Sequence, residues 1–600
     1  MASAGTPSEL HGRAFYESLG SPKFVVAPMV DQSEFAWRML TRSFLTKEEN
    51  AKLLAYTPML HARLFVETAK YRETHFQAIK EPLEPVESGL PGAGAAESLY
   101  LDGNPQFDRP LFVQFCANDP DHLLKAAKLV APYCDAVDLN LGCPQGIARK
   151  GHYGAFLQED QELIFKLINT LHKNLPIPVT AKIRILESKE QTLAYAKNVL
   201  AAGASILTVH GRRREQKGHL TGVADWEYIR YLRDNLPKET VIFANGNILQ
   251  HGDIERCLEA TGADAVMSAE GNLSDPSVFA EPPPAGQEGR EYWRGRDGKG
   301  GYRIDAIYRR YMDILHKYVL EHEPPRRRPL FVVGDDEAWL HETDSRDDDH
   351  EDGPARKKAK RDGGTAANKR STSPNIVAVR PHLFHLLRHF ISEHTDIRDM
   401  LAKTAPSDMA GMEKVLDLIE RRIAQGLIEY ERTEGKSIEA YMQVPKPKQK
   451  GLADESEAVA SGDAEIKEGD EADADPESSV ATVKACKRPW WVAQPIVRPL
   501  PKEALAKGSI RISKKEKKKQ AQEQAQAAVT SSAATSAPAP TPTATAITTS
   551  TAAVQGSDGE NKRLSDELPI SDAKDGGVRE PPLDLDSKAS GLANEELVCG

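Results

Sequence analysis

Residues 136–144 read Ala136-Val137-Asp138-Leu139-Asn140-Leu141-Gly142-Cys143-Pro144. The first six form a short, mainly apolar run, which predicts a buried β-strand, and the Gly-Cys-Pro corner ends it. A glycine-rich basic segment, residues 145–154, follows directly. Barrel enzymes keep their reactive groups where the strands end. Cys143 is therefore a candidate reactive thiol, and a small hydrophobic cysteine in a turn is the alternative interpretation.

Seven more runs of this kind lie in the first half of the chain, and helix-length amphipathic stretches separate several of them. Nearly continuous hydrophobicity is typical of parallel strands that are buried on both faces. The eight runs are residues 24–29, 54–59, 111–116, 135–141, 178–184, 206–210, 241–245 and 265–268. They predict an α/β protein with a (β/α)8 TIM barrel. A doubly wound sheet is the alternative, but no GxGxxG motif opens a helix after the first run.

Polar or functional side chains recur at or just past the C-terminal ends of these runs. In a barrel these ends form one face, the face on which active sites are built. The residues are Met29, Gln114, Asn140, Lys182, His210, Asn245 and Glu270. Glycine-containing loops after the seventh and eighth strands are a common phosphate cradle, and Gln114 can both donate to and accept from a flavin edge. Together these features predict a site for flavin mononucleotide (FMN).

Beyond the barrel, the pattern changes to helices and then to charged, low-complexity sequence. We expect a small all-α domain, because apolar residues recur at helical spacing in residues 304–318, 379–393 and 412–430. Long charged stretches with few aromatic residues predict disorder. The predicted organisation is an N-terminal extension 1–22, an FMN-binding barrel domain 23–300 with an insertion near 81–109, a helical domain 301–445 with a disordered insertion 321–373, and a disordered tail 446–600.

One segment of the predicted tail stands apart from its surroundings. Residues 487–499 place Trp490 and Trp491 between arginines. Such a segment is expected to dock, either on the protein itself or on a nucleic acid by stacking. The sequence leaves both interpretations open.

Composition restricts the class of protein without naming it. The net charge is −11, but the acidic residues gather in 344–352 and 454–477, so the sign does not exclude a nucleic-acid partner. The six cysteines include no CxxC pair, and we expect neither a disulfide framework nor a metal site. No signal peptide or membrane span is recognisable, which predicts an intracellular protein, in the cytoplasm, the nucleus or both. The basic runs 356–361 and 514–519 suit nuclear import or simply solvated charge.

Several quoted segments resemble the dihydrouridine synthases of tRNA. Residues 26–31, 140–144, 182–184, 208–212 and 244–248 carry this resemblance. Residues 56–61, 115–119 and 394–398 are similar to the eukaryotic branch that acts on positions 16 and 17. The likeness spans the barrel in order and continues through the helical domain and the Trp-Trp segment.

The resemblance implies an FMN enzyme that reduces the C5–C6 bond of uridine in the D-loop of tRNA, with NADPH or NADH as electron donor. Hydride from the reduced flavin would add to C6, and Cys143 would deliver the proton to C5. By the same resemblance, Pro28, Met29 and Val30 line the flavin ring, Gln114 and Lys182 contact it, and His210, Asn245, Gly246, Asn247, Ala269 and Glu270 hold the ribityl phosphate end.

The partner is expected to be tRNA, with no membrane and no metal, and the protein is expected to act as a monomer. The target uridine must leave its stack to reach the flavin. By the resemblance, the helical domain 301–445 binds the tRNA together with basic residues near the thiol, which are Arg149, Lys150, His152 and Arg184.

Two other functions fit part of the pattern. One is another FMN barrel oxidoreductase that acts on a free pyrimidine, which would not need the basic helical domain. The other is a tRNA-binding chaperone without turnover, which would not need Cys143, Lys182 and His210 together.

Overall fold

The computed structural model describes residues 10–80, 83, 99–341, 373–443 and 478–506. Eight parallel strands form a closed sheet in the order β2-β1-β9-β8-β7-β6-β5-β4, and pairing between β2 and β4 closes it. The strands are β1 (Phe24–Val26), β2 (Leu53–Tyr56), β4 (Leu111–Cys116), β5 (Ala136–Leu141), β6 (Val179–Arg184), β7 (Ile206–His210), β8 (Val241–Asn245) and β9 (Ala265–Ser268). This arrangement confirms the predicted (β/α)8 barrel. A two-residue strand, β3 (Leu60–His61), pairs with the end of β4.

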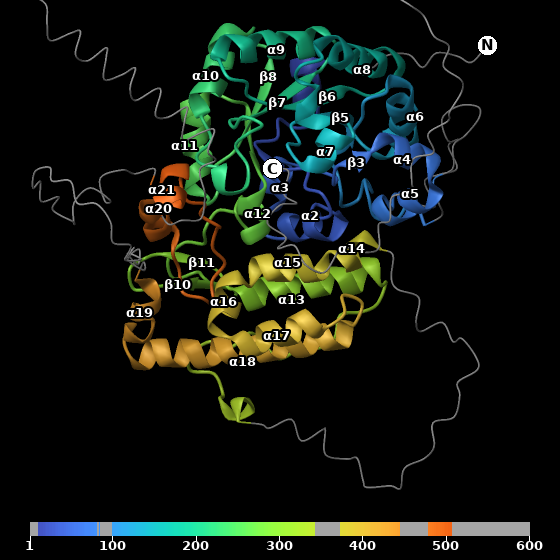
Figure 1. The fold of residues 1–600 in the computed structure, drawn as a ribbon. Helices are drawn as coiled ribbons and strands as arrows, with labels where there is room; N and C mark the ends of the chain where they lie inside the picture. Colours follow the sequence, from blue (N-terminus) through green and yellow to red (C-terminus); the bar gives the residue numbers. More distant parts are fainter. Residues whose placement is uncertain (1–9, 81–82, 84–98, 342–372, 444–477, 507–600) are drawn as a thin grey trace, which may run out of the picture. The chain divides into compact units, whose positions relative to one another are not determined.

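Helices between the strands surround the barrel (Figure 1). They are α1 (Gly12–Ser18), α2 (Phe35–Arg42), α3 (Lys47–Asn50), α4 (Ala62–Glu67), α5 (Ala69–His75), α6 (Pro120–Val130), α7 (Gly146–Lys150), α8 (Gln161–Asn174), α9 (Lys189–Ala201), α10 (Trp226–Asn235), α11 (Gly252–Thr261) and α12 (Glu270–Ser274). Side-chain caps set where the outer helices begin, because Asp119, Asp160, Ser188 and Asp225 each accept a backbone N–H from the first turn. Every residue of the eight barrel strands except Phe24 is buried, as the apolar runs predict.

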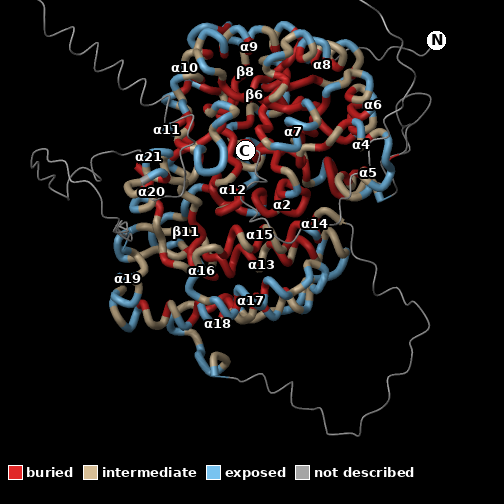
Figure 2. The backbone as a smooth tube through the Cα atoms, in the orientation of Figure 1, coloured by how far each residue is buried: buried red, intermediate tan, exposed pale blue. Residues whose placement is uncertain are grey.

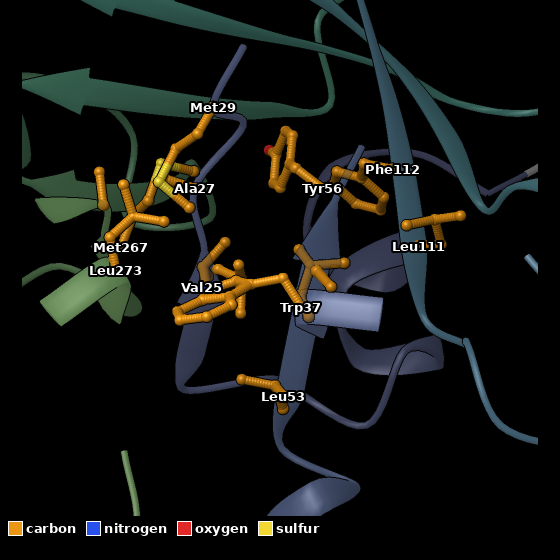
Figure 3. Packing of buried hydrophobic residues seen from close by; sticks show 14 of the residues in the cluster. Val25, Ala27, Met29, Trp37, Leu53, Tyr56, Leu111, Phe112, Met267 and Leu273 are labelled. Carbon is orange, nitrogen blue, oxygen red and sulfur yellow. The ribbon is translucent and has the colours of Figure 1, made fainter. Parts of the chain in front are cut away.

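The core extends from the strands to the first helix after β1. Figure 3 shows Val25 and Leu53 from the strands gathered with Trp37 from α2. Arg38, on the same helix, is fully buried and forms ion pairs with Asp102 at 2.7 Å and Asp108 at 2.5 Å. These two carboxylates belong to the segment 81–109 that the sequence assigns to an insertion. Residues 99–109 are thus an integral part of the barrel packing, whereas 81–82 and 84–98 lie outside the described residues.

A helical bundle packs against the barrel on the side of α2. It consists of α13 (Ile304–Ile314), α14 (Pro374–Val377), α15 (Val379–Leu386), α16 (Arg388–Glu393), α17 (Thr395–Lys403), α18 (Met409–Arg432) and α19 (Glu439–Met442). The ring of His382 on α15 stacks on Trp37 with centroids 4.0 Å apart, and its Nε2 lies 3.0 Å from the Glu34 carboxylate. Trp37, His382 and Glu34 are all buried. Figure 2 shows the backbone of α2 and α13 coloured largely as buried. Barrel and bundle therefore share one core.

Part of the predicted disordered insertion is ordered. Within 321–373, residues 321–341 lie against the bundle, where Arg327 pairs with Glu413 at 2.7 Å and Arg328 sits 3.7 Å above the Trp339 ring. Arg327 and Glu413 are far apart in the sequence, so charge-rich composition gives no sign of their contact. Residues 342–372, with the basic run 356–361, lie outside the described part, as do 1–9 and most of the tail, with the basic run 514–519.

The segment 478–506, here called the C-terminal strap, docks on the protein. It contains α20 (Ser479–Cys486) and α21 (Pro501–Ala506) and runs beside the ribbon of β10 (Tyr292–Arg294) and β11 (Gly300–Tyr302). Trp491 is fully buried, its carbonyl accepts the N–H of Ile304 at 3.0 Å, and the N–H of Ala493 donates to the Tyr302 carbonyl at 3.0 Å. Gly426 makes room for the neighbouring Trp490, because a Cβ there would lie 2.7 Å from the indole. Among the described helices, none has the length and apolar character needed to cross a bilayer.

Candidate active site

Buried polar side chains line the barrel interior towards the C-terminal ends of its strands. The sheet register pairs Asn140 with Lys182 and His210 with Asn245. Each of these four residues is about 2 % exposed. The structure therefore places the members of each pair side by side on neighbouring strands, and Lys182 and His210 lie two residues apart in the register of β6 and β7. Within the described residues, no group of three or more His, Cys, Asp or Glu is arranged to hold a metal ion.

A hydrogen-bond network fixes Gln114 on β4. Its Nε2 donates to Asp138 Oδ2 at 2.8 Å, and its Oε1 accepts from Asn140 Nδ2 at 2.8 Å. Thr180 Oγ1 donates to the other Asp138 oxygen at 2.6 Å. Burial raises the pKa of Asp138 to about 6, although the bonds from Thr180 and Gln114 oppose this rise. Asp138 and Thr180 are functional neighbours that the sequence interpretation missed, and a polar residue in the middle of an apolar run was the available signal.

His210 presents a defined donor to the barrel interior. Burial lowers its pKa well below the ordinary value, and Arg184, Lys182 and Arg212 lower it further, so the ring is neutral. Arg212 Nη1 lies 3.1 Å from His210 Nε2, and because a guanidinium only donates, Nε2 is the acceptor. The proton of the neutral ring is therefore on Nδ1. That atom is buried and has no hydrogen-bond partner among the described residues.

The loop after β8 lies next to this histidine. Gly246 has a φ of +113°, and a Cβ there would lie 2.6 Å from Ala224 Cβ and 3.2 Å from the His210 ring. Asn247 follows with a φ of 62°, and its Oδ1 accepts a bond from Arg212. The buried Asn245 Oδ1 also lacks a partner within the described part of the chain. Buried polar atoms are nearly always satisfied, and these two, on neighbouring strands, therefore keep unused hydrogen-bonding capacity within the described residues.

The backbone around Cys143 is held on several sides. Asn140 Oδ1 accepts the N–H of Gly142 at 3.1 Å and of Cys143 at 2.9 Å. The Cys143 carbonyl accepts the N–H of Ala155 at 3.1 Å. Gly154, with a φ of +64°, allows this approach, because a Cβ there would lie 2.9 Å from the Cys143 oxygen. Asn140 thus links the Gln114 network to the thiol loop.

The Cys143 thiol is reduced and 1 % exposed. It belongs to a small cluster of buried side chains with Cys116 and Tyr153, against which Val30 and Met59 pack. Burial raises the pKa of the Cys116 thiol far above its ordinary value, and Cys143 adds to the rise. The sequence interpretation missed Cys116. It is the last residue of β4, and Cys143 lies just past the end of the neighbouring β5.

The remaining predicted cofactor residues lie after β1 and after β9. Pro28, Met29 and Val30 lie just past the end of β1, and the Met29 N–H donates to Ser33 Oγ at 3.0 Å. Ala269 is buried, and Glu270 begins α12 and pairs with Arg498 of the C-terminal strap at 2.7 Å.

The four proposed RNA contacts do not share one environment. Arg149 and Lys150 on α7 and the neighbouring His152 are exposed. Arg184 is 4 % exposed, and its Nε donates to the Gly142 carbonyl at 2.7 Å. Arg184 therefore supports the Cys143 loop from inside the protein rather than standing on its surface.

Comparison with known proteins is consistent with this geometry. The family model described as "Dihydrouridine synthase (Dus)" matches residues 25–293. The chain is 47 % identical over 394 residues to the "tRNA-dihydrouridine(16/17) synthase [NAD(P)(+)]" of Saccharomyces cerevisiae, an alignment that covers 66 % of this chain and 72 % of that protein. It is 42 % identical over 418 residues to the protein of the same name from Schizosaccharomyces pombe, covering 70 % and 82 %. A human protein named "tRNA-dihydrouridine(20a/20b) synthase [NAD(P)+]-like" is 32 % identical over 259 residues, covering 43 % and 70 %.

Proposed function

The chain belongs to the dihydrouridine synthase family, and we propose that it is an NAD(P)H-dependent tRNA-dihydrouridine synthase that reduces uridines 16 and 17 of the D-loop to 5,6-dihydrouridine. The observation that carries this proposal is the match to two relatives named for these positions, 72 % and 82 % of whose lengths the chain covers. The strand ends add a thiol, a lysine and a neutral histidine, in Cys143, Lys182 and His210, which support the proposal.

FMN is the proposed cofactor, and the unpartnered polar atoms of the barrel support it. The His210 Nδ1–H offers a donor and the Asn245 Oδ1 an acceptor, both buried. Gly246, with a φ of +113°, lets the loop after β8 pack closely against the His210 ring beside them. We infer that Pro28, Met29 and Val30 contact the flavin ring with Gln114 and Lys182, and that His210, Asn245, Gly246, Asn247, Ala269 and Glu270 form the ribityl phosphate end. When bound and reduced by NADPH or NADH, FMN supplies the hydride that C6 of the uracil receives.

The residues of the chain supply the proton and hold the reacting groups in place. Hydride addition at C6 leaves negative charge on C5 and the C4 oxygen, and the Cys143 thiol gives its proton to C5. A thiol has an ordinary pKa of about 8.5, so it is mostly protonated at neutral pH. Asn140 fixes the backbone of the thiol loop and the orientation of Gln114. The Lys182 ammonium favours negative charge nearby.

The tRNA has to deliver an unstacked uridine to this interior. We propose that the exposed Arg149, Lys150 and His152 contact the RNA backbone near the thiol loop, together with the helical bundle. The monomer is the proposed functional form, because one chain supplies the barrel, the bundle and the strap. Since the substrate is tRNA, we place the enzyme inside the cell, in the cytoplasm, the nucleus or both.

The test uses the full chain with FMN, NADPH and unmodified tRNA. We expect dihydrouridine at positions 16 and 17, mapped by mass spectrometry of tRNA fragments. Cys143→Ala should retain FMN and tRNA binding and lose most turnover, whereas the buried Cys257→Ala, on α11 away from the site, should remain active. Full activity of Cys143→Ala would remove the thiol from the mechanism. An FMN-loaded wild type that binds tRNA without forming dihydrouridine would favour the chaperone function, and reduction of free pyrimidine alone would favour the other oxidoreductase.

A further inference from the structure

The C-terminal strap crosses from the bundle to the barrel loops that follow β7 and β9. Its residues 491–493 pair with the chain at Tyr302 and Ile304. Further on, Arg498 reaches α12, and Pro501 at the start of α21 packs beside Gly222, where a Cβ would lie 3.3 Å from the proline ring. Residues from the far end of the described chain therefore stand next to the proposed phosphate end of the cofactor site.

The contact between the strap and this end is a two-pronged ion pair. Arg498 Nη2 lies 2.7 Å from Glu270 Oε1, and Arg498 Nε lies 3.0 and 3.1 Å from the two carboxylate oxygens. About a fifth of the arginine side chain and a quarter of the glutamate side chain remain exposed. Burial alone would raise the pKa of Glu270, but Arg498 and then Arg212 bring it below its ordinary value. Glu270 is thus ionised.

An ionised carboxylate is an unfavourable neighbour for a phosphate. Glu270 follows β9, and the loop of Gly246 and Asn247 follows the adjacent β8. Arg212 bridges the two places, since it bonds Asn247 and is close enough to Glu270 to affect its pKa. With Arg498 present, the two guanidinium groups leave one net positive charge around Glu270. Without Arg498, the carboxylate and Arg212 cancel, so the positive charge available to attract an anion at this place falls by one.

We propose that Arg498 is a positioning residue of the cofactor site, which neutralises and orients Glu270 so that the phosphate of FMN is accepted between the loops after β8 and β9. The C-terminal strap is then part of the cofactor site. This inference rests on the proposed function, because it takes FMN as the ligand. The side chain acts through Glu270 rather than by touching the reacting atoms.

The test compares FMN with riboflavin, which has the same ring and no phosphate. Affinities are measured by quenching of flavin fluorescence with flavin-free full-length chain. Arg498→Met should weaken FMN binding about tenfold, the size of one lost charge-assisted contact, and should leave riboflavin binding unchanged. Arg498→Lys should keep most of the FMN affinity. Arg488→Met removes the same charge from the same strap, where its side chain bonds only backbone carbonyls, and should leave both affinities unchanged.

A double variant separates neutralisation from direct phosphate contact. If Arg498 acts through Glu270, then Glu270→Gln combined with Arg498→Met should recover FMN affinity to within about threefold of the wild type. The inference is overturned if the double variant binds FMN as weakly as Arg498→Met, if riboflavin and FMN weaken together, or if Arg498→Met binds FMN normally. Failure of the wild-type chain to bind FMN at all would instead overturn the proposed cofactor.

Discussion

Asn140→Ala tests the link between the interior network and the thiol loop. In the wild type, Asn140 makes three buried hydrogen bonds, at 2.8 Å to Gln114 and at 3.1 and 2.9 Å from the N–H groups of Gly142 and Cys143. Asn140→Ala leaves the N–H groups of Gly142 and Cys143 and the Gln114 Oε1 acceptor without this partner. At about 1 kcal/mol or more for each group, the folded state should lose about 3 kcal/mol. The thiol loop should also shift, and displacement of a reacting group by about 1 Å can cost about 100-fold in rate.

The assay separates the two halves of the reaction. Reduction of the flavin by NADPH does not use the thiol and should proceed at the wild-type rate in Asn140→Ala. Oxidation of the reduced enzyme by excess tRNA, followed by stopped-flow absorbance, should be about 100-fold slower.

Asn140→Asp is the matched control, because it keeps the oxygen that accepts from Gly142 and Cys143. It should lie between the wild type and the alanine variant in the tRNA-dependent step. Wild-type oxidation by tRNA in Asn140→Ala would refute the argument that this side chain positions Cys143. Loss of flavin reduction as well would point to a damaged cofactor site instead.

Three other predictions use different parts of the site. Gly154→Ala should lower the free energy of unfolding by about 1–3 kcal/mol, because the φ of Gly154 is +64° and an added Cβ would lie against the Cys143 oxygen. Gly146→Ala is the control, because a Cβ there meets no atom within 4 Å. Equal melting temperatures for the two variants would contradict this prediction. Burial raises the pKa of Asp138 from 3.8 to about 6 in the folded protein. The free energy of unfolding should therefore be highest below about pH 3.8 and should fall by about 3 kcal/mol as the pH rises through about 6. Asp138→Asn should flatten that fall in pH-dependent denaturation curves, and an unchanged curve would count against it. Arg149→Met with Lys150→Met should weaken tRNA binding and reduce its salt dependence by a slope of about 2, while Arg230→Met, also an exposed arginine but on α10 of the barrel wall, should not.

The barrel was predictable because its strands carry a local signal. Apolar runs of strand length lie at every observed barrel strand, and polar residues at their ends meet because parallel strands share one C-terminal face. This reasoning placed Lys182, His210 and Asn245 together. It missed Asp138, whose importance depends on Gln114 and Thr180 on the strands to either side.

Features made by long-range contacts could not be predicted from composition. Arg184 looks like an exposed cation in the sequence, and only the packing of the Cys143 loop shows that it is an internal support. Residues 321–341 and the strap have the composition of flexible segments. They are held by contacts with residues far away in the chain, such as the ion pairs of Arg327 with Glu413 and of Arg498 with Glu270.

The shared core of barrel and bundle has a consequence for how the substrate is received. Trp37 stacks on His382, and Glu34 meets the same imidazole, with all three side chains buried. A hinge motion between barrel and bundle would have to expose the Trp37 indole and separate the Glu34 carboxylate from the His382 ring. We therefore expect the two parts to move as one rigid body when the tRNA binds. The distortion required for catalysis must then occur in the RNA, and tRNAs with a loosely folded D-arm should be modified faster than tightly folded ones.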